Sequence, residues 1–254
     1  MISASYIYDT ILTLIRKDQH GNSFNIDEFN RIIKLVNYEL YNSYAGKVGE
    51  DISNVEALKD FMVYNASVAM TAGVGSLPTG YERLMGNPHW TGLLGAEYIP
   101  LDVVNALELK IRRDDYLTQP SVTWPVAYIG GAQVASKSQI QVHPVVMAGM
   151  AAIIIDYLRL PATPFLDYYV ASTGLYVYMA ASPATVSIPA GATYRDGTAG
   201  PLPTQSSSTV NFEWGEDQTP IIINMILQKA GIVLEKQVAI EYGIARETKE
   251  AQND

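Results

Sequence analysis

The sequence predicts an α+β fold, with N- and C-terminal helices packed as a bundle, a small antiparallel β-sheet, and a long loop or arm insertion. Apolar residues recur at helical spacing near both ends, alternate around residues 130–131, and give way to a stretch rich in Ser, Thr, Ala, Gly and Pro. We divide the chain into residues 1–76 (N-terminal helices), 77–165 (a mixed β-rich core with one helix), 166–210 (an extended loop or arm insertion) and 211–254 (C-terminal helices that complete the bundle).

Two amphipathic helices are predicted at the start of the chain. The first follows a serine cap at Ser3 or Ser5, and its apolar face carries Ile7, Ile11, Leu14 and Ile15. In the second, Asn25 and Glu28 have the spacing of a capping box, which satisfies backbone N–H groups that a helix start leaves free. Its apolar face carries Phe29, Ile32, Ile33, Val36 and Leu40. Both faces need a partner surface.

A third helix is predicted from Ser53, where Glu56 repeats the capping spacing, to about Met70. Residues 77–95 contain Pro or Gly at six positions, a density that favours a loop with one short strand. Trp90 lies in this loop, and we interpret it as an anchor.

The middle of the chain is predicted to hold one helix and most of the sheet. Asp102 is the expected cap of a helix that ends near Arg113. Residues 122–129 and 132–143 are predicted to pair as a hairpin around a two-residue glycine turn, because glycine supplies the positive φ angles of such turns. The aliphatic run 152–158 fits a buried strand or part of a helix, and we favour the strand.

The stretch 172–209 has the composition of an exposed loop or arm. Short strands are predicted within it at residues 175–179 and 185–188. Deleting this stretch is expected to leave a folded monomer and to impair assembly.

Near the C-terminus, Asp217 is predicted to cap a helix whose apolar residues are Ile221, Ile222, Met225 and Ile226. Gly231 interrupts it, and a further helix is predicted from Ile232 to about Lys249. The N-terminal residues predict a helix and no signal peptide, and no apolar run reaches the roughly 20 residues of a membrane span. The sequence therefore predicts a soluble protein made in the cytoplasm.

Composition excludes several classes of function. With 48% hydrophobic and 17% charged residues the chain is expected to fold. A net charge of −9 opposes tight binding to a phosphate backbone, which needs clustered Lys and Arg. The chain has no cysteine, so it offers neither a disulfide nor a thiolate ligand.

No motif predicts chemistry. Gly46-Lys47 and Gly73-Val74-Gly75 lack the context of phosphate-binding loops, and no nucleophile elbow is present. The three histidines, His20, His89 and His143, lack metal-ligand spacing, and the adjacent acids Asp114 and Asp115 fit a solvated helix end better than a catalytic pair. We therefore expect no catalytic residue, no cofactor and no metal.

Tyrosine is abundant, with 17 residues, and it clusters in two parts of the chain. Its apolar ring and polar tip suit protein interfaces, although half-buried packing is an equally good explanation for any single tyrosine. The aromatic residues that we assign to a possible subunit interface are Trp90, Tyr168, Tyr169, Tyr176, Tyr178 and Trp214.

Four segments, in this order, carry a family resemblance. They are Leu77-Pro78-Thr79-Gly80-Tyr81; Ile140-Gln141-Val142-His143-Pro144; Asp156-Tyr157-Leu158-Arg159-Leu160-Pro161 with Pro164-Phe165; and Asn211-Phe212-Glu213-Trp214 before the 221–227 helix. Together they resemble the head-to-tail connector or tail ring proteins of short-tailed bacteriophages, especially the crAss-like group. The resemblance covers residues 1–165 and 209–250, and Gly215 stands where the family pattern has a proline.

The resemblance implies a non-enzymatic structural protein of the virion, made in the bacterial host. Such a subunit forms a homo-oligomeric ring between portal and tail, contacts the portal and other connector proteins, and surrounds the channel through which double-stranded DNA leaves. A negative ring would let DNA pass without tight binding, and no membrane is involved.

Two alternatives stay open. A carbohydrate- or receptor-binding tail module would use the tyrosines and the loop-rich residues 166–210. An enzyme with a site assembled from distant acids would show a deep pocket lined by two or more carboxylates with shifted pKa values.

Overall fold

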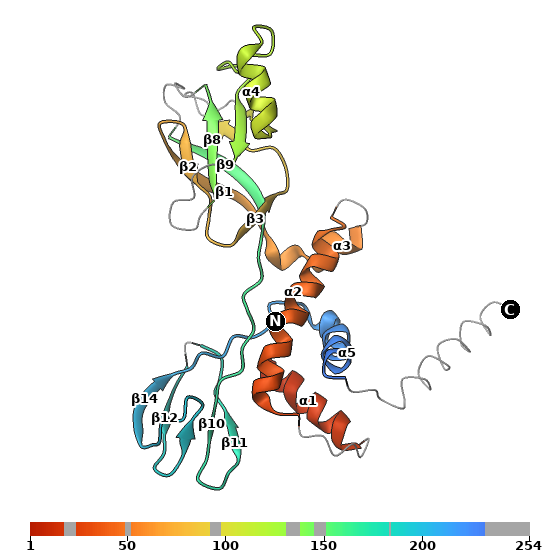
Figure 1. Ribbon diagram of the computed structural model, residues 1–254, viewed down its shortest axis with the longest axis vertical. Helices are drawn as coiled ribbons and strands as arrows, with labels where there is room; N and C mark the ends of the chain where they lie inside the picture. Colours follow the sequence, from red (N-terminus) through yellow and green to blue (C-terminus); the bar gives the residue numbers. More distant parts are fainter. Residues whose placement is uncertain are drawn as a thin grey trace, which may run out of the picture. The chain divides into compact units, whose positions relative to one another are not determined.

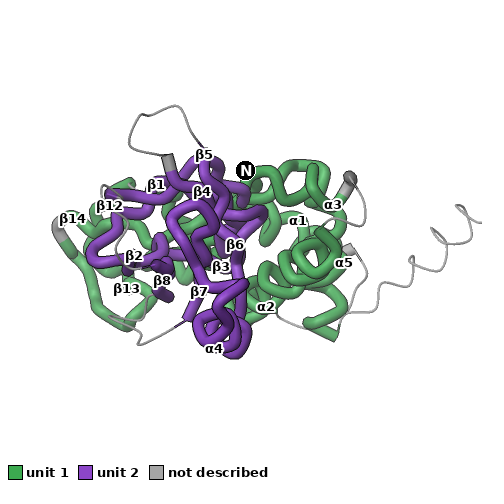
Figure 2. The backbone as a smooth tube through the Cα atoms, turned by 90° about the horizontal axis from the view of Figure 1, so that it is seen from above, with its two compact units in different colours: residues 1–60, 161–254 green, residues 61–160 purple. Residues whose placement is uncertain are grey.

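The structure is a computed structural model of the chain, and it describes residues 1–17, 24–48, 52–91, 98–130, 138–144, 151–182 and 184–231. The chain divides into two compact units, which Figure 1 shows as ribbons and Figure 2 in two colours. Unit 1 comprises residues 1–60 and 161–254, and unit 2 comprises residues 61–160.

The helices of unit 1 come from both ends of the chain. They are α1 (Ala4–Lys17), α2 (Ile26–Ala45), α3 (Ile52–Ala57) and α5 (Thr219–Lys229), with the short 3₁₀ segment η2 (Glu216–Gln218) before α5 and a second, η1 (Lys59–Phe61), leading into unit 2. The Asn25 side chain accepts a hydrogen bond from the Glu28 N–H at 2.7 Å, so the predicted cap of α2 is confirmed. The apolar faces of α1 and α2 are buried, and α5 packs against both helices.

Two buried asparagines on α2 hold the chain that returns from unit 2. Asn30 exchanges two hydrogen bonds of 2.9 Å with the backbone of Leu166. Asn37, one heptad further, donates to the Ala162 carbonyl at 3.1 Å and accepts from the Trp214 indole at 2.8 Å. Because each buried amide has partners on both its oxygen and its nitrogen, α2 orients these segments without leaving a polar group unpaired.

The predicted arm is folded into two small antiparallel sheets of unit 1. Strands β10 (Tyr168–Val170), β11 (Tyr176–Tyr178) and β13 (Thr193–Tyr194) form one in the order β11-β10-β13, and β12 (Thr185–Ile188) pairs with β14 (Leu202–Ser206) in the other. The two short strands predicted in this stretch are confirmed as β11 and β12. The expectation of an extended loop or arm is wrong, because the stretch forms these paired strands and buries Met179, Ile188 and Thr209, although most of its other described residues are exposed.

A fully buried carboxylate, Asp167, joins these strands. The Arg195 guanidinium lies 3.0 Å from it, and the Tyr194 hydroxyl and the Ser208 N–H donate to it at 2.9 and 2.8 Å. The Tyr168 N–H donates to its other oxygen at 3.0 Å. A buried charge is tolerated when it is paired and hydrogen-bonded, as here.

Unit 2 is built on a nine-stranded mixed sheet. Its strands are β1 (Met62–Thr71), β2 (Val74–Ser76), β3 (Tyr81–Leu84), β4 (His89–Thr91), β5 (Tyr98–Pro100), β6 (Asp102–Val104), β7 (Val126–Ile129), β8 (Gln139–His143) and β9 (Ala152–Arg159). The order is β5-β4-β9-β1-β2-β8-β7-β6, and β3 also pairs with β9. All pairs are antiparallel except β6 with β7. The strand favoured for residues 152–158 is confirmed as β9.

Strand β1 replaces most of the predicted third helix, which ends at Ala57. Its last residues alternate, with Val68 and Met70 buried against the core. Between Val63 and Ala66 the pairing with β9 shifts at a bulge, where Asn65 has φ 55°. The bulge interrupts the period of two, and this interruption hides the strand in the sequence.

The predicted hairpin is present as the antiparallel pair β7 and β8, but its two-residue turn is wrong. Ile129 pairs with Ile140, so ten residues separate the paired positions, of which 131–137 lie outside the described residues. Near the C-terminus, Asp217 lies within η2, and Gln218 occupies the cap position of α5. The helix predicted from Ile232 to Lys249 also lies outside the described residues.

The predicted fold class is therefore wrong. Across the described residues, strands outnumber α-helices by fourteen to five, and the main sheet is large and mixed where a small antiparallel one was expected. Residues 62–76 and the arm account for the difference. Strand β1 enters its sheet by pairing with β9, about 90 residues away, which local periodicity does not report. The strands of the arm pair with one another within residues 168–206.

Candidate interaction site

The most exposed apolar part of the described residues is the connection between β6 and β7. Parallel strands need a crossover, and this one consists of α4 (Ala106–Asp114) and the loop of residues 115–125. Asp102, the predicted cap, is paired with Val126 inside the sheet. Asn105 caps α4 in its place, and its side chain accepts from the Glu108 N–H at 2.9 Å. The predicted helix is thus confirmed with a corrected start.

Arg112 links α4 to the sheet through ion pairs. Its guanidinium lies 2.6 Å from Asp102 in β6 and 2.6 Å from Glu108 one turn earlier on the helix. The hydrogen bonds to these two carboxylates raise the pKa of Arg112 above its ordinary value. The two contacts fix the orientation of the helix surface, although partly exposed ion pairs of this kind contribute little stability.

Only one side chain of α4 is buried. Leu109 packs against Val104 and Val126 in a small cluster with Tyr128. Leu107 and Ile111, one turn apart on the helix, are 69% and 59% exposed. An amphipathic helix ordinarily buries such residues, so α4 presents part of its apolar surface to solvent.

The loop after α4 presents further apolar side chains on an ordered backbone. The Asp115 carboxylate accepts from the Leu117 N–H at 3.1 Å and the Thr118 hydroxyl at 2.9 Å. Ser121 and Trp124 exchange two backbone hydrogen bonds of 3.2 and 3.1 Å. These turns hold Tyr116, Leu117 and Trp124 at 91%, 88% and 78% exposure.

We call this region the α4 surface, defined by Leu107, Ile111, Tyr116, Leu117, Val122 and Trp124. These are six of the fifteen large apolar side chains exposed among the described residues. Since an aromatic side chain covers 150–250 Å², Tyr116 and Trp124 alone expose about 300 Å². Apolar exposure on this scale is typical of protein interaction sites.

Two cations border the α4 surface. Lys110 and Arg113 are exposed, and with Asp114 they line a groove of about 460 Å³ along the helix. Neither cation forms an ion pair within the described part of the chain, and the groove carries one net positive charge. Nearby, burial lowers the pKa of His143, and the charge of Arg113 lowers it further.

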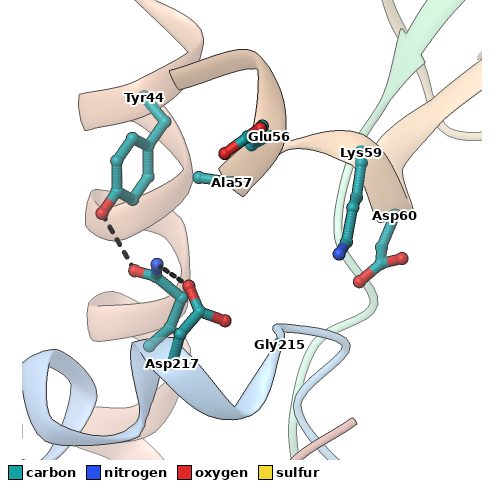
Figure 3. A pocket seen from close by; sticks show the side chains of 8 residues that line it. Tyr44, Glu56, Ala57, Lys59, Asp60, Gly215 and Asp217 are labelled. Carbon is teal, nitrogen blue, oxygen red and sulfur yellow. Dashed lines mark hydrogen bonds between the residues drawn. The ribbon is translucent and has the colours of Figure 1, made fainter. Parts of the chain in front are cut away.

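Unit 1 has an open cleft of about 640 Å³ that carries the opposite charge (Figure 3). We call it the carboxylate cleft, and it is lined by Tyr44, Glu56, Ala57, Lys59, Asp60, Gly215, Asp217 and Gln218. Three carboxylates and one ammonium give it a formal charge of −2. Its floor is ordered, because the Tyr44 hydroxyl donates to Gln218 at 2.9 Å and Gln218 donates to Asp217 at 2.6 Å.

Gly215, where the resemblance predicts a proline, lies at the edge of the carboxylate cleft. Its φ of −65° is the angle that proline imposes, so the backbone here has a conformation that a proline could also adopt. A Cβ added at this position would contact the Asp217 carboxylate. The glycine therefore leaves room for that carboxylate beside the cleft.

The aromatic residues predicted for an interface are mostly packed within their own units. Trp90 is buried in β4 of unit 2, and Trp214 is buried in unit 1. Tyr168 is buried and stacks edge to face with Tyr176, which is 49% exposed. Tyr169 and Tyr178 are partly buried in β10 and β11. Their role in an interface stays a prediction, and Tyr176 is the most exposed of them.

The α4 surface was missed because its helical residues fit the apolar face of a core helix. A signal was present in the sequence, since Tyr116, Leu117 and Trp124 lie in a polar, turn-rich segment that cannot bury three large side chains. Apolar residues in such a segment indicate contact with another molecule.

No group of three or more His, Asp or Glu side chains is close enough to hold a metal ion among the described residues. His89 stacks on Tyr98 at 5.0 Å, and His20 lies outside the described residues. None of the described helices is long and apolar enough to cross a membrane.

Comparison with models of known protein families finds no match for this chain. Comparison with curated proteins finds no matching protein either.

Proposed function

We propose that this protein is a structural subunit that assembles through its α4 surface. The larger structure is a ring between the portal and the tail of a tailed bacteriophage. Its partners are copies of itself, the portal and other connector proteins, and it resides in the virion. The observation that carries the proposal is the exposure of six large apolar side chains on and after α4.

Removing the apolar side chains of the α4 surface from water would favour association. Burying apolar area contributes about 25 cal/mol per Å², so the roughly 300 Å² of Tyr116 and Trp124 would contribute about 7 kcal/mol before the costs of association. An isolated subunit forgoes this stabilisation. Arg112 and the loop turns hold the side chains in place beforehand, which lowers the entropy lost on binding.

The charge of the chain supports a position around DNA. A net charge of −9 repels phosphates, and a lumen with this charge would let DNA slide through without being gripped. The four motifs that resemble the phage connector proteins supply the link to the portal and tail.

Oligomeric state tests the first part of the proposal. We expect the wild-type protein to form a closed oligomer in native mass spectrometry, and the double variant Leu117→Ser, Trp124→Ser to be monomeric with unchanged thermal unfolding. The matched control is Leu35→Ser, Tyr38→Ser, which removes two exposed apolar residues from α2 of unit 1. Oligomers that survive the first variant, or are lost in the control alone, would contradict the role of the α4 surface.

Copy number tests the place in the virion. Quantitative mass spectrometry of purified particles is expected to give a low, ring-like ratio of this protein to the major capsid protein. A ratio typical of a fibre or decoration protein would favour the carbohydrate- or receptor-binding tail module. Absence from particles would refute the virion proposal.

A further inference from the structure

We infer that the α4 surface of one copy binds the carboxylate cleft of a second copy of this chain, so that copies join head to tail. The inference rests on the proposed function and names the partner of the α4 surface. It follows from the charges beside the two sites, the apolar residues around them, and the symmetry that each pairing would produce.

The charges beside the α4 surface indicate which kind of partner it binds. Lys110 and Arg113 are exposed and without an ion pair among the described residues. If two α4 surfaces met face to face, Lys110 and Arg113 of one copy would be brought toward Lys110 and Arg113 of the other. Like charges across an interface disfavour the pairing, so this surface fits a negative partner.

The carboxylate cleft offers that charge. Glu56 and Asp217 line it and are exposed, and its formal charge is −2. It is open at the surface and large enough to admit the ends of two long cationic side chains. The chain as a whole carries −9, so copies repel at long range, and a local match of opposite charges favours contact at the two sites.

Apolar groups that suit the α4 surface lie next to the cleft. The segment η2 separates it from a second open cleft of about 590 Å³, lined by residues that include Met1, Tyr6 and Pro220. Met1 and Tyr6 are 77% and 58% exposed, and Ile221 of α5 is 40% exposed. An interface of standard size buries about 800 Å² from each partner, so the contact would extend beyond the cleft onto these neighbouring apolar residues.

Joining two different surfaces has a geometric consequence. A contact between unlike patches is heterologous, so every copy keeps one free α4 surface and one free cleft after the first contact forms. Repetition closes a ring or extends a filament. A contact of the α4 surface with itself would instead stop at a dimer.

The absence of cysteine from the sequence makes a clean cross-linking test possible. Ala106 lines the groove on α4 and Ala57 lines the carboxylate cleft, and replacing them by cysteine leaves every charge in place. The full chain carrying Ala106→Cys and Ala57→Cys would be treated with a short bismaleimide, free in solution and in particles. We expect a ladder of covalent dimers, trimers and larger species on a denaturing gel.

The single-cysteine variants are the controls. Neither alone should cross-link, and a mixture of the two should give dimers only. Dimers from Ala106→Cys alone would show that α4 surfaces meet each other and would overturn the inference. Oligomers of normal size without any ladder would also overturn it, while leaving the proposed function intact. If the wild type forms no oligomer in solution or in particles, the proposed function fails first.

Charge exchange supplies a second readout. Lys110→Glu with Arg113→Glu, or Glu56→Lys with Asp217→Lys, should each reduce the ladder at least tenfold. Combining all four changes in one chain should restore it, because the opposite charges face each other again. Loss of the ladder in the combined variant, with thermal unfolding unchanged, would contradict the pairing.

Discussion

The indole N–H of Trp214 donates a hydrogen bond of 2.8 Å to the side-chain oxygen of Asn37, and both residues are buried in unit 1. Asn37 in turn donates to the carbonyl of Ala162 at 3.1 Å. One amide thus links α2 to two segments that lie more than a hundred residues away in sequence. The packing of unit 1 depends on this buried polar link as well as on its apolar contacts.

Replacing Trp214 by Phe should destabilise unit 1 by about 1–3 kcal/mol. The variant keeps an aromatic ring but leaves the Asn37 oxygen buried without its donor, which costs free energy in this range. Urea unfolding followed by circular dichroism measures the change. The matched control is Trp124→Phe at a side chain that is 78% exposed, where we expect a change within about 0.5 kcal/mol. Equal losses in both variants would exclude the hydrogen bond as the cause.

Replacing Asp167 by Asn should lower the free energy of unfolding further, by roughly 3 kcal/mol. Removing one partner of a buried ion pair leaves the other charge without a counterion. Arg195 would lose its partner, and Asn offers one acceptor oxygen where the carboxylate offers two. The same denaturation experiment measures the loss. As a control, Asp196→Asn changes the neighbouring exposed acid and should have a clearly smaller effect. An unchanged midpoint for Asp167→Asn would refute the role of this carboxylate in holding the small sheets.

The sequence predicted the parts of the fold that are locally encoded. The cap at Asn25 and the apolar stripes of α1 and α2 are confirmed, because capping and helical spacing act over three or four residues. Strand β9 was recognised from its apolar run. Strand β1 was mistaken for a helix, because its alternation is broken at Asn65 and its partner, β9, lies about 90 residues away.

The candidate site was harder to predict for a related reason. Periodicity shows that Leu107 and Ile111 share one face of a helix, but it does not show whether another part of the same chain covers that face. The structure shows that only Leu109 is covered. The charges of the carboxylate cleft come from residues 56–60 and 215–218, and only folding brings these together.

Stability should decline at alkaline pH through Tyr168. Burial, followed by its hydrogen bond to Asp27, raises the pKa of this hydroxyl to about 12, against an ordinary value of 10.0. Between these values the unfolded chain loses the proton and the folded protein keeps it, so the free energy of unfolding falls as the pH rises from about 10 to about 12. Urea midpoints measured across this range should show the decline.

The variant Tyr168→Phe identifies the group responsible. It has no proton to lose, so its stability should fall less steeply over the same pH range, whatever its stability at neutral pH. A residual slope is expected, because burial also raises the pKa of Tyr194 and of Tyr81. A slope equal to that of the wild type would show that Tyr168 does not govern the alkaline transition.

The turn between β1 and β2 offers a stabilising change at Ala72. Thr71 pairs with Val74, and the two residues between them, Ala72 and Gly73, have φ values of 50° and 77°. Positive φ at both positions defines the turn in which Asn-Gly is preferred. Alanine costs roughly 1–2 kcal/mol in this conformation, whereas the short polar side chain of asparagine can hydrogen-bond locally and offset part of that cost. Ala72→Asn should therefore raise the free energy of unfolding by up to about 1 kcal/mol, and Ala72→Val should lower it, because a β-branched side chain tolerates positive φ least. A pair of shifts in the opposite order, measured as urea midpoints, would mean that the turn does not hold this conformation in solution.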